Sequence, residues 1–225
     1  MKKQEMLKIE AAVVQISQSK SRGVLIPGNM ILTAAHCVSM NLDAVNLNDG
    51  PIEHIITAKG EQLTVEAIAV EPVNDIAVLG SLDEQERSEE AGAFEAFCRS
   101  TKAVKICLAR FEAFESFPVH ILNANGKWIW AKAKKCHEDA QVFIVEPDEN
   151  IEAGASGGPI VTEDGELVGI VTKLSHSIVS GVTKSAWGWT PYPPLTLPLW
   201  VTKRVFGGNL ARWTQNLKSR HNVKA

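Results

Sequence analysis

The sequence lacks any long apolar segment. No uninterrupted run of about 18 apolar residues, the length of a membrane-spanning helix, occurs in the chain. Near its start, Gln4, Glu5, Lys8 and Glu10 interrupt what would have to be an apolar stretch of roughly 7 to 15 residues in a secretory signal peptide. We therefore expect no membrane partner and no export by that route, and we predict a cytoplasmic location.

Cysteine is scarce, and its spacing does not suit a metal site. The chain has four cysteines and no Cys-x-x-Cys pair, so we expect no metal and free thiols in a reducing compartment. An excess of charge of one sign is also absent: the net charge of −3 gives no reason to expect a nucleic-acid partner. With 45% apolar residues, the chain can bury a substantial core.

Short segments with strand character dominate the chain. Residues 1–80 hold about six of them, enough for one small barrel. Residues 81–102 are acidic and predict a solvated linker with a helical portion, although a partner-binding segment is the alternative. Strand-like segments return over residues 103–203. In the last part, residues 204–225, Leu210, Trp213 and Leu217 share one helical face and predict a C-terminal helix.

A glycine-rich stretch at residues 151–161 places Ser156 between small residues. A serine hydroxyl is a poor nucleophile and needs a nearby base, with backbone donors for the oxyanion it creates. Gly154 can adopt a conformation closed to other residues, so the N–H groups of Gly154 and Ser156 could point into one small hole. A plain glycine turn between strands is the alternative interpretation of this stretch alone.

Two upstream stretches supply partners for such a serine. His36 ends an apolar segment among small residues, and histidine is the natural general base near neutral pH. Asp75 stands before the apolar segment 76–79, where a carboxylate could accept the Nδ1 proton of a histidine. Singly, His36 is more often a core or turn histidine, and Asp75 is more often a turn residue before a strand. Together, the order His, Asp, Ser is one known route to a nucleophilic triad.

The three stretches at residues 33–37, 74–79 and 154–159 closely resemble the signature stretches of chymotrypsin/trypsin-like serine proteases. The resemblance covers about residues 11 to 175, and the segment 45–50 looks like that of bacterial HtrA-type members. It implies an all-β fold of two packed six-stranded antiparallel β-barrels, with a C-terminal α-helix. It further implies that His36 and Asp75 come from the first barrel and Ser156 from the second.

Two departures from that family affect regulation. Secreted trypsins carry an aspartate before the nucleophile, which pairs with an N-terminus freed by cleavage, whereas this chain has Ala155. We therefore expect either a constitutively formed oxyanion hole or control by a partner or a loop rearrangement. Cys37 takes the place of a disulfide-bonded cysteine of animal trypsins, but the segment 22–26 offers no second cysteine, so that bridge is absent.

The resemblance also predicts a substrate pocket and groove. The residue six before the nucleophile lies at the base of the pocket in this family, and here it is Asn150. Its neutral amide cannot replace the aspartate that pairs with Arg or Lys, so we expect no strong trypsin-like cleavage. The further candidates for the pocket and groove are Ile151, Thr172, Lys173 and Leu174; a bound peptide is expected to add as a β-strand there.

The sequence thus predicts a serine endopeptidase that needs no cofactor. Its partners would be a protein or peptide substrate and a possible regulatory protein. The alternative is a catalytically silent protease homologue that acts as a protein-binding module.

Overall fold

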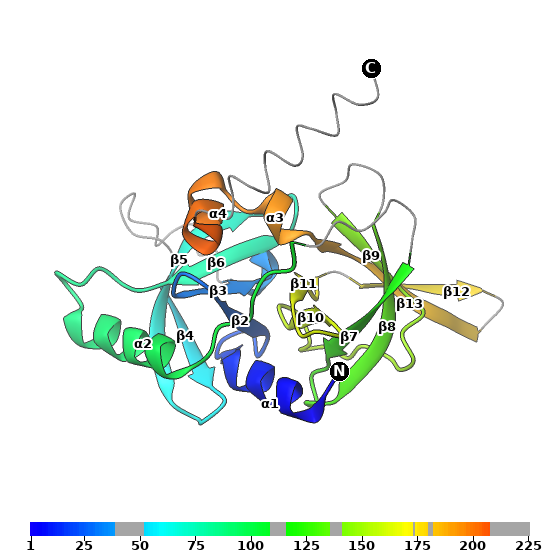
Figure 1. Ribbon diagram of the computed structural model, residues 1–225, viewed down its shortest axis with the longest axis horizontal. Helices are drawn as coiled ribbons and strands as arrows, with labels where there is room; N and C mark the ends of the chain where they lie inside the picture. Colours follow the sequence, from blue (N-terminus) through cyan, green and yellow to red (C-terminus); the bar gives the residue numbers. More distant parts are fainter. Residues whose placement is uncertain (39–51, 109–115, 136–140, 173, 180–181, 208–225) are drawn as a thin grey trace, which may run out of the picture.

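The chain folds into two antiparallel β-structures that lie side by side (Figure 1). The computed structural model describes residues 1–38, 52–108, 116–135, 141–172, 174–179 and 182–207. Strands β1 to β6 form the first structure and strands β7 to β13 the second. The predicted two-barrel, all-β architecture is therefore confirmed.

The first structure is a closed six-stranded barrel in the order β1-β2-β3-β6-β5-β4, because β1 pairs with both β2 and β4. In β4 and β5, buried residues alternate with more exposed ones, which is the pattern of a strand with one face on a core. Every residue of β3 and β6 is buried. The strands span Val13–Ile16 (β1), Arg22–Ile26 (β2), Met30–Thr33 (β3), Ile52–Thr57 (β4), Gln62–Glu71 (β5) and Ile76–Gly80 (β6).

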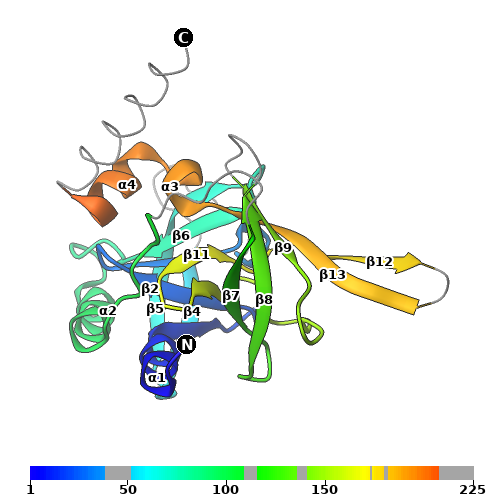
Figure 2. The same cartoon turned by 45° about the vertical axis from the view of Figure 1, so that its right-hand side comes forward.

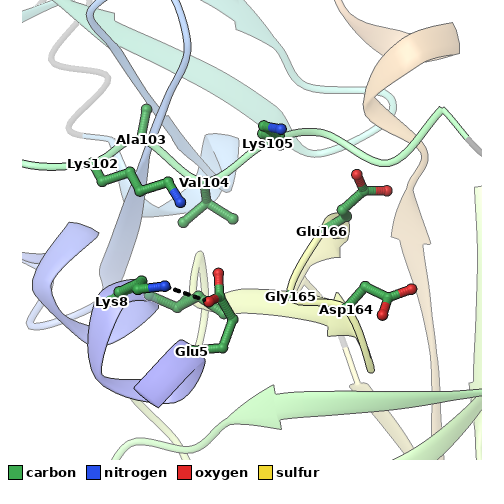
Figure 3. A pocket seen from close by; sticks show the side chains of 10 residues that line it. Glu5, Lys8, Lys102, Ala103, Val104, Lys105, Asp164, Gly165 and Glu166 are labelled. Atoms are coloured by element: carbon green, nitrogen blue, oxygen red, sulfur yellow. Dashed lines mark hydrogen bonds and ion pairs between the residues drawn. The ribbon is translucent and has the colours of Figure 1, made fainter. Parts of the chain in front are cut away.

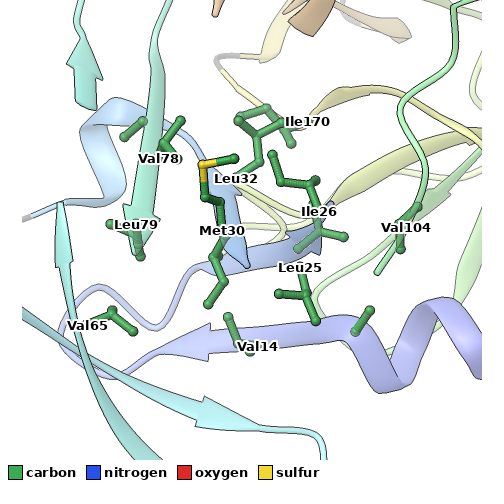
Figure 4. Close-up of a cluster of buried hydrophobic side chains, with 14 of the residues drawn as sticks. Val14, Leu25, Ile26, Met30, Leu32, Val65, Val78, Leu79, Val104 and Ile170 are labelled. Atoms are coloured by element: carbon green, nitrogen blue, oxygen red, sulfur yellow. The ribbon is translucent and has the colours of Figure 1, made fainter. Parts of the chain in front are cut away.

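The core of this barrel continues into the seam between the two structures (Figure 4). Leu25, Ile26 and Leu32 are completely or almost completely buried. They share one cluster with Val104, which follows the linker, and with Ile170 of the second structure. Truncating one such buried leucine to alanine typically costs about 2–5 kcal/mol. The apolar seam therefore holds the two halves in one fixed relation.

The second structure is a seven-stranded sheet in the order β11-β10-β7-β8-β9-β13-β12, one strand more than predicted. Its strands span Ser116–Leu122 (β7), Trp128–Lys135 (β8), Gln141–Val145 (β9), Pro159–Thr162 (β10), Leu167–Ile170 (β11), Leu174–Val179 (β12) and Val182–Pro191 (β13). The extra strand, β12, pairs with the far part of β13, and this hairpin projects away from the barrel (Figure 2).

A buried threonine nearly closes the second barrel. The Thr190 hydroxyl on β13 donates to the carbonyl oxygen of Ile170 at 2.7 Å and accepts from its N–H at 2.8 Å. The neighbouring Val171 N–H donates to the Gly158 carbonyl oxygen beside β10 at 2.8 Å, so the backbone groups of Ile170 point away from β10. The threonine hydroxyl on β13 therefore pairs both polar groups of Ile170 on that other side.

Helices flank the two barrels. α2 (Ser88–Ser100) lies in the predicted acidic linker and buries Ala91, Phe94, Phe97 and Cys98, whose spacing of three and four defines one face. The remaining helical segments are α1 (Lys3–Ala12), η1 (Ala35–Cys37), α3 (Pro193–Thr196) and α4 (Leu199–Phe206). No helix of the described residues is long and apolar enough to cross a membrane.

Some features near the two ends of the chain were not predicted. α1 precedes the first strand, which begins at residue 13. α3 and α4 lie in a part of the chain rich in proline and tryptophan, where no helix was predicted. The helix predicted over residues 210–217 lies outside the described residues. The domain boundaries at residues 80, 102 and 203 stay a prediction.

Candidate active site

His36 and Asp75 of the first barrel are joined by hydrogen bonds. The His36 Nδ1 atom lies 2.8 Å from Asp75 Oδ2 and 3.0 Å from Oδ1. The backbone N–H of His36 also donates to Asp75 Oδ1 at 3.0 Å. A carboxylate so placed favours the tautomer with the proton on Nδ1, which leaves Nε2 as the basic nitrogen. The His36 side chain is 38% exposed and that of Asp75 is 17% exposed, so the pair remains open to an incoming molecule.

A tight turn after β5 presents Asp75. The residue has φ of 55°, a left-handed conformation that aspartate tolerates better than most residues. Upstream, the Glu71 carboxylate accepts from the N–H groups of Val73 at 3.0 Å and Asn74 at 2.7 Å, and from Asn74 Nδ2 at 2.6 Å. Burial acts to raise the pKa of Glu71, but these hydrogen bonds outweigh it and hold the pKa below its ordinary value. Glu71 therefore acts as the anchor of the turn that carries Asp75.

Ser156 lies on the loop before β10, and backbone contacts press this loop against the first barrel. The Ser156 carbonyl oxygen accepts from the N–H of Arg22 at 2.8 Å. A Cβ added at Gly157 would lie 1.9 Å from the Arg22 carbonyl oxygen and 2.4 Å from Thr33 Oγ1. Thr33 precedes His36 by three residues, so the serine loop sits against the strands that lead to the histidine.

No hydrogen bond joins the Ser156 hydroxyl to the His36 ring within the described ranges. Such bonds are often long without substrate and shorten in the complex. The side chains of His36 and Asp75 are thus in direct contact, whereas the Ser156 loop is held against the first barrel by contacts of its backbone with Arg22 and Thr33.

The turn at residues 152–155 precedes the serine. It is closed by the Ala155 N–H, which donates to the Glu152 carbonyl oxygen at 3.2 Å. Gly154 occupies its third position with φ of 92°, as a type II turn requires. Across the described residues, the N–H groups of Gly154 and Ser156 donate to no protein acceptor. Two unpaired donors two residues apart can together hold a negative oxygen.

The trypsin-like peptidase domain model matches residues 21–170, a range that contains His36, Asp75 and Ser156. The chain belongs to the trypsin-like peptidase family. Among solved structures, it is similar to the Rv3671c protease from M. tuberculosis in its active form, with 13% identity, a TM-score of 0.55, and coverage of 90% of this chain and 84% of that one. A serine-to-alanine mutant of Rv3671c in its inactive form gives 14% identity, a TM-score of 0.53, and coverage of 94% and 90%. No curated protein matches the sequence.

The predicted pocket residues of this trypsin-like peptidase lie on both sides of the serine loop. Asn150 is exposed, and its carbonyl oxygen accepts from Asn123 Nδ2 at 3.2 Å. Ile151 and Thr172 are buried, at 6% and 8% exposure. Lys173 lies outside the described residues, and Leu174 opens β12.

Four contacts of the peptidase site were not predicted, and all but the contact of Glu71 with Asn74 join residues more than ten positions apart in sequence. They involve Arg22, Thr33, Glu71 and Asn123. Asn123, which follows β7, makes one of these contacts. Its burial, at 1% exposure, is the signal of this role, and burial of a single polar residue is not visible in the sequence.

Other chemistry is not indicated by the described part of the peptidase. No group of three or more metal-binding side chains occurs there. Cys37, Cys98 and Cys107 are buried and form no disulfide among the described residues, and burial raises the pKa of Cys98 to about 11. A pocket of about 130 Å³ between α1, the linker and the β10–β11 turn is lined by charged side chains, including the ion pair of Lys8 and Glu5 (Figure 3). It contains none of the predicted catalytic residues.

Proposed function

We propose that the protein is a serine endopeptidase that opens peptide bonds through an acyl-enzyme intermediate. The observation that carries the proposal is the pair of hydrogen bonds between His36 Nδ1 and the Asp75 carboxylate. His36 lies three residues along the chain from Thr33, against which the Ser156 loop is packed. An Nδ1 held by a carboxylate leaves Nε2 able to take a proton from a nearby hydroxyl.

The reaction assigns one task to each group. Ser156 Oγ attacks the peptide carbonyl while His36 Nε2 takes the hydroxyl proton. Asp75 orients the ring and stabilises its positive charge. The oxyanion that forms is held by the N–H groups of Gly154 and Ser156. His36 then gives its proton to the leaving amine, and water hydrolyses the acyl-enzyme by the same steps.

Cleavage after Arg or Lys is not part of the proposal. A peptide cation in the pocket would need a carboxylate, and Asn150 offers only a neutral amide. We expect a protein or peptide substrate without a basic residue before the cut.

We propose that the enzyme is intracellular and cuts one or a few defined proteins under the control of a partner. Ala155 leaves no carboxylate for the ion pair that switches on secreted trypsins, and it is completely buried. Promiscuous cleavage of unfolded chains by the isolated protein, together with failure to capture a partner, would instead favour a quality-control protease.

Labelling with a fluorophosphonate probe tests the enzyme directly. The probe reacts with an activated serine, so the native protein should be labelled and Ser156→Ala should not. Cleavage sites are then mapped by mass spectrometry, with Ser156→Ala as the control. A wild-type protein that folds but is neither labelled nor active on unfolded casein would refute the proposal.

The second candidate is a silent protease homologue that binds proteins. It is favoured by one observation, the missing hydrogen bond between Ser156 and His36 among the described residues. This candidate predicts that a folded wild-type protein and Ser156→Ala bind the same protein equally well, and that neither reacts with the probe.

A further inference from the structure

Asn123 is a buried polar side chain that the proposed reaction does not use. It follows β7, and its side chain makes three hydrogen bonds. Its Oδ1 atom accepts from the N–H of Glu152 at 2.8 Å and from the N–H of Ala124 at 2.9 Å. Its Nδ2 atom donates to the Asn150 carbonyl oxygen at 3.2 Å. One side chain therefore holds both ends of the segment 150–152.

That segment leads directly into the oxyanion turn. Glu152, whose N–H is bound by Asn123, is also the residue whose carbonyl oxygen closes the turn at residues 152–155. The position of Gly154 within this turn thus depends on where Asn123 holds Glu152. Gly154 also lies against the Asn123 turn itself, because a Cβ added at Gly154 would be 3.5 Å from the Cβ of Ala124.

The turn that carries Asn123 is itself tied to the residue that holds Ser156. Arg22 Nη2 donates to the Ala124 carbonyl oxygen at 2.6 Å. The backbone N–H of the same arginine donates to the Ser156 carbonyl oxygen at 2.8 Å. Asn123 therefore holds the residues before Gly154, and Arg22 holds Ser156 after it. Both side chains also bind the backbone of Ala124.

We propose that Asn123 is a positioning residue for the oxyanion hole, which keeps the N–H groups of Gly154 and Ser156 aimed at one point. The inference rests on the proposed peptidase function. Ala155 is buried and carries no charge, so hydrogen bonds from a neutral amide do the work that an ion pair could not do here. The hole is then formed without cleavage of the chain.

The location of these contacts predicts which kinetic constant they affect. The oxyanion exists in the transition state and not in the bound substrate, so misaligned donors lower kcat and leave KM nearly unchanged. His36 and Asp75 are not contacted by Asn123, so the midpoint of the pH profile should stay in place while its plateau falls.

The test compares Asn123→Ala with Asn125→Ala. Asn125 lies in the same turn but is exposed, and its side chain binds the Lys127 N–H at 2.9 Å and the Glu152 carboxylate at 3.3 Å. The probes are a fluorophosphonate and a fluorogenic peptide that copies a cleavage site found in casein. All variants are assayed at a temperature below the midpoint of their thermal unfolding, which is followed by circular dichroism.

We expect Asn123→Ala to lower both kcat and the labelling rate by at least about 10-fold, a fraction of the loss typical when an oxyanion donor is removed. KM and the pH midpoint should match the wild type, and Asn125→Ala should behave as wild type in every readout. Asn123→Asp places a carboxylate oxygen beside the Asn150 carbonyl oxygen and a negative charge next to the oxyanion turn, so its kcat should fall at least as far as that of Asn123→Ala. It carries the same test if the alanine variant does not fold.

A folded Asn123→Ala variant with the kcat of Asn125→Ala would overturn the inference. So would a folded Asn123→Asp variant in which KM rises and kcat does not change. Both results require an active wild type. A wild type that neither reacts with the probe nor cleaves casein counts against the proposed function instead.

Discussion

The substitution Gly157→Ala addresses the contact between the serine loop and the first barrel. Gly157 has φ of 75°, and its N–H donates to the Val171 carbonyl oxygen at 2.7 Å. A methyl group there would lie 1.9 Å from the carbonyl oxygen of Arg22 and 2.4 Å from Thr33 Oγ1. The Arg22 oxygen is backbone and already accepts from the Thr33 hydroxyl at 2.6 Å, so it cannot turn aside cheaply.

The loss of stability in Gly157→Ala has two causes, the left-handed backbone conformation and the overpacking. A substitution at a second glycine measures the first cause alone. Alanine in a left-handed conformation costs roughly 1–2 kcal/mol at any position. Gly60, in the turn between β4 and β5, has φ of 82° and open space where its Cβ would point. Gly60→Ala should therefore cost only that amount. Gly157→Ala adds overpacking against backbone, typically about 1–3 kcal/mol, which predicts about 2–5 kcal/mol in total.

Urea unfolding of both variants measures the two free energies, and fluorophosphonate labelling measures the site. Because the loop must move to admit the methyl group, Gly157→Ala should lose at least about 100-fold in labelling rate, as small displacements of catalytic groups do. Gly60→Ala should label at the wild-type rate. Equal losses of stability in the two variants, with normal labelling of Gly157→Ala, would refute the packing described here.

Three further outcomes follow from single contacts. Asp75→Asn should lower kcat by about 10⁴-fold with a small change in KM, measured by steady-state kinetics, because the amide favours the wrong tautomer of His36. Against the effect of burial, the hydrogen bonds to Glu71 hold its pKa below the ordinary value of 4.5, so its contribution to stability is present above pH 4.5 and is lost as the pH falls through the folded pKa. The difference in unfolding free energy between wild type and Glu71→Gln should therefore shrink in urea titrations at decreasing pH. Thr190→Val removes the hydroxyl that both bonds to Ile170 use and should cost about 1–3 kcal/mol, with faster amide exchange at Ile170.

The local parts of the fold could be predicted because their causes are local. Alternating apolar and polar residues predicted β4 and β5, and the spacing of Phe94 and Phe97 predicted a helical portion in the acidic linker. The motifs around His36 and Asp75 predicted a contact that the structure contains as hydrogen bonds. The catalytic roles of these residues and of Ser156 stay predictions.

Other elements could not be predicted from pattern alone. α1 has Lys, Glu, Gln and Ala in plenty, so its helix propensity was a usable signal, but its apolar periodicity is weak because most of its surface faces solvent. Near the end of the chain, Pro193 begins α3 and Pro198 precedes α4, positions where a helix tolerates proline well. Prolines in this part of the chain therefore mark the starts of helices.

The residues that hold the site were the hardest to predict, and their energetics explain why. A single hydrogen bond such as Asn123 to Glu152 or Arg22 to Ala124 contributes only about 0.5–1.5 kcal/mol to folding, so the fold does not require it and no composition signal records it. Catalysis is more demanding, because a displacement of about 1 Å at a reacting group can cost about 100-fold in rate. These contacts therefore matter more for position than for stability. The residues that hold the serine loop in place therefore have partners far along the chain, as Arg22 and Ala124 do.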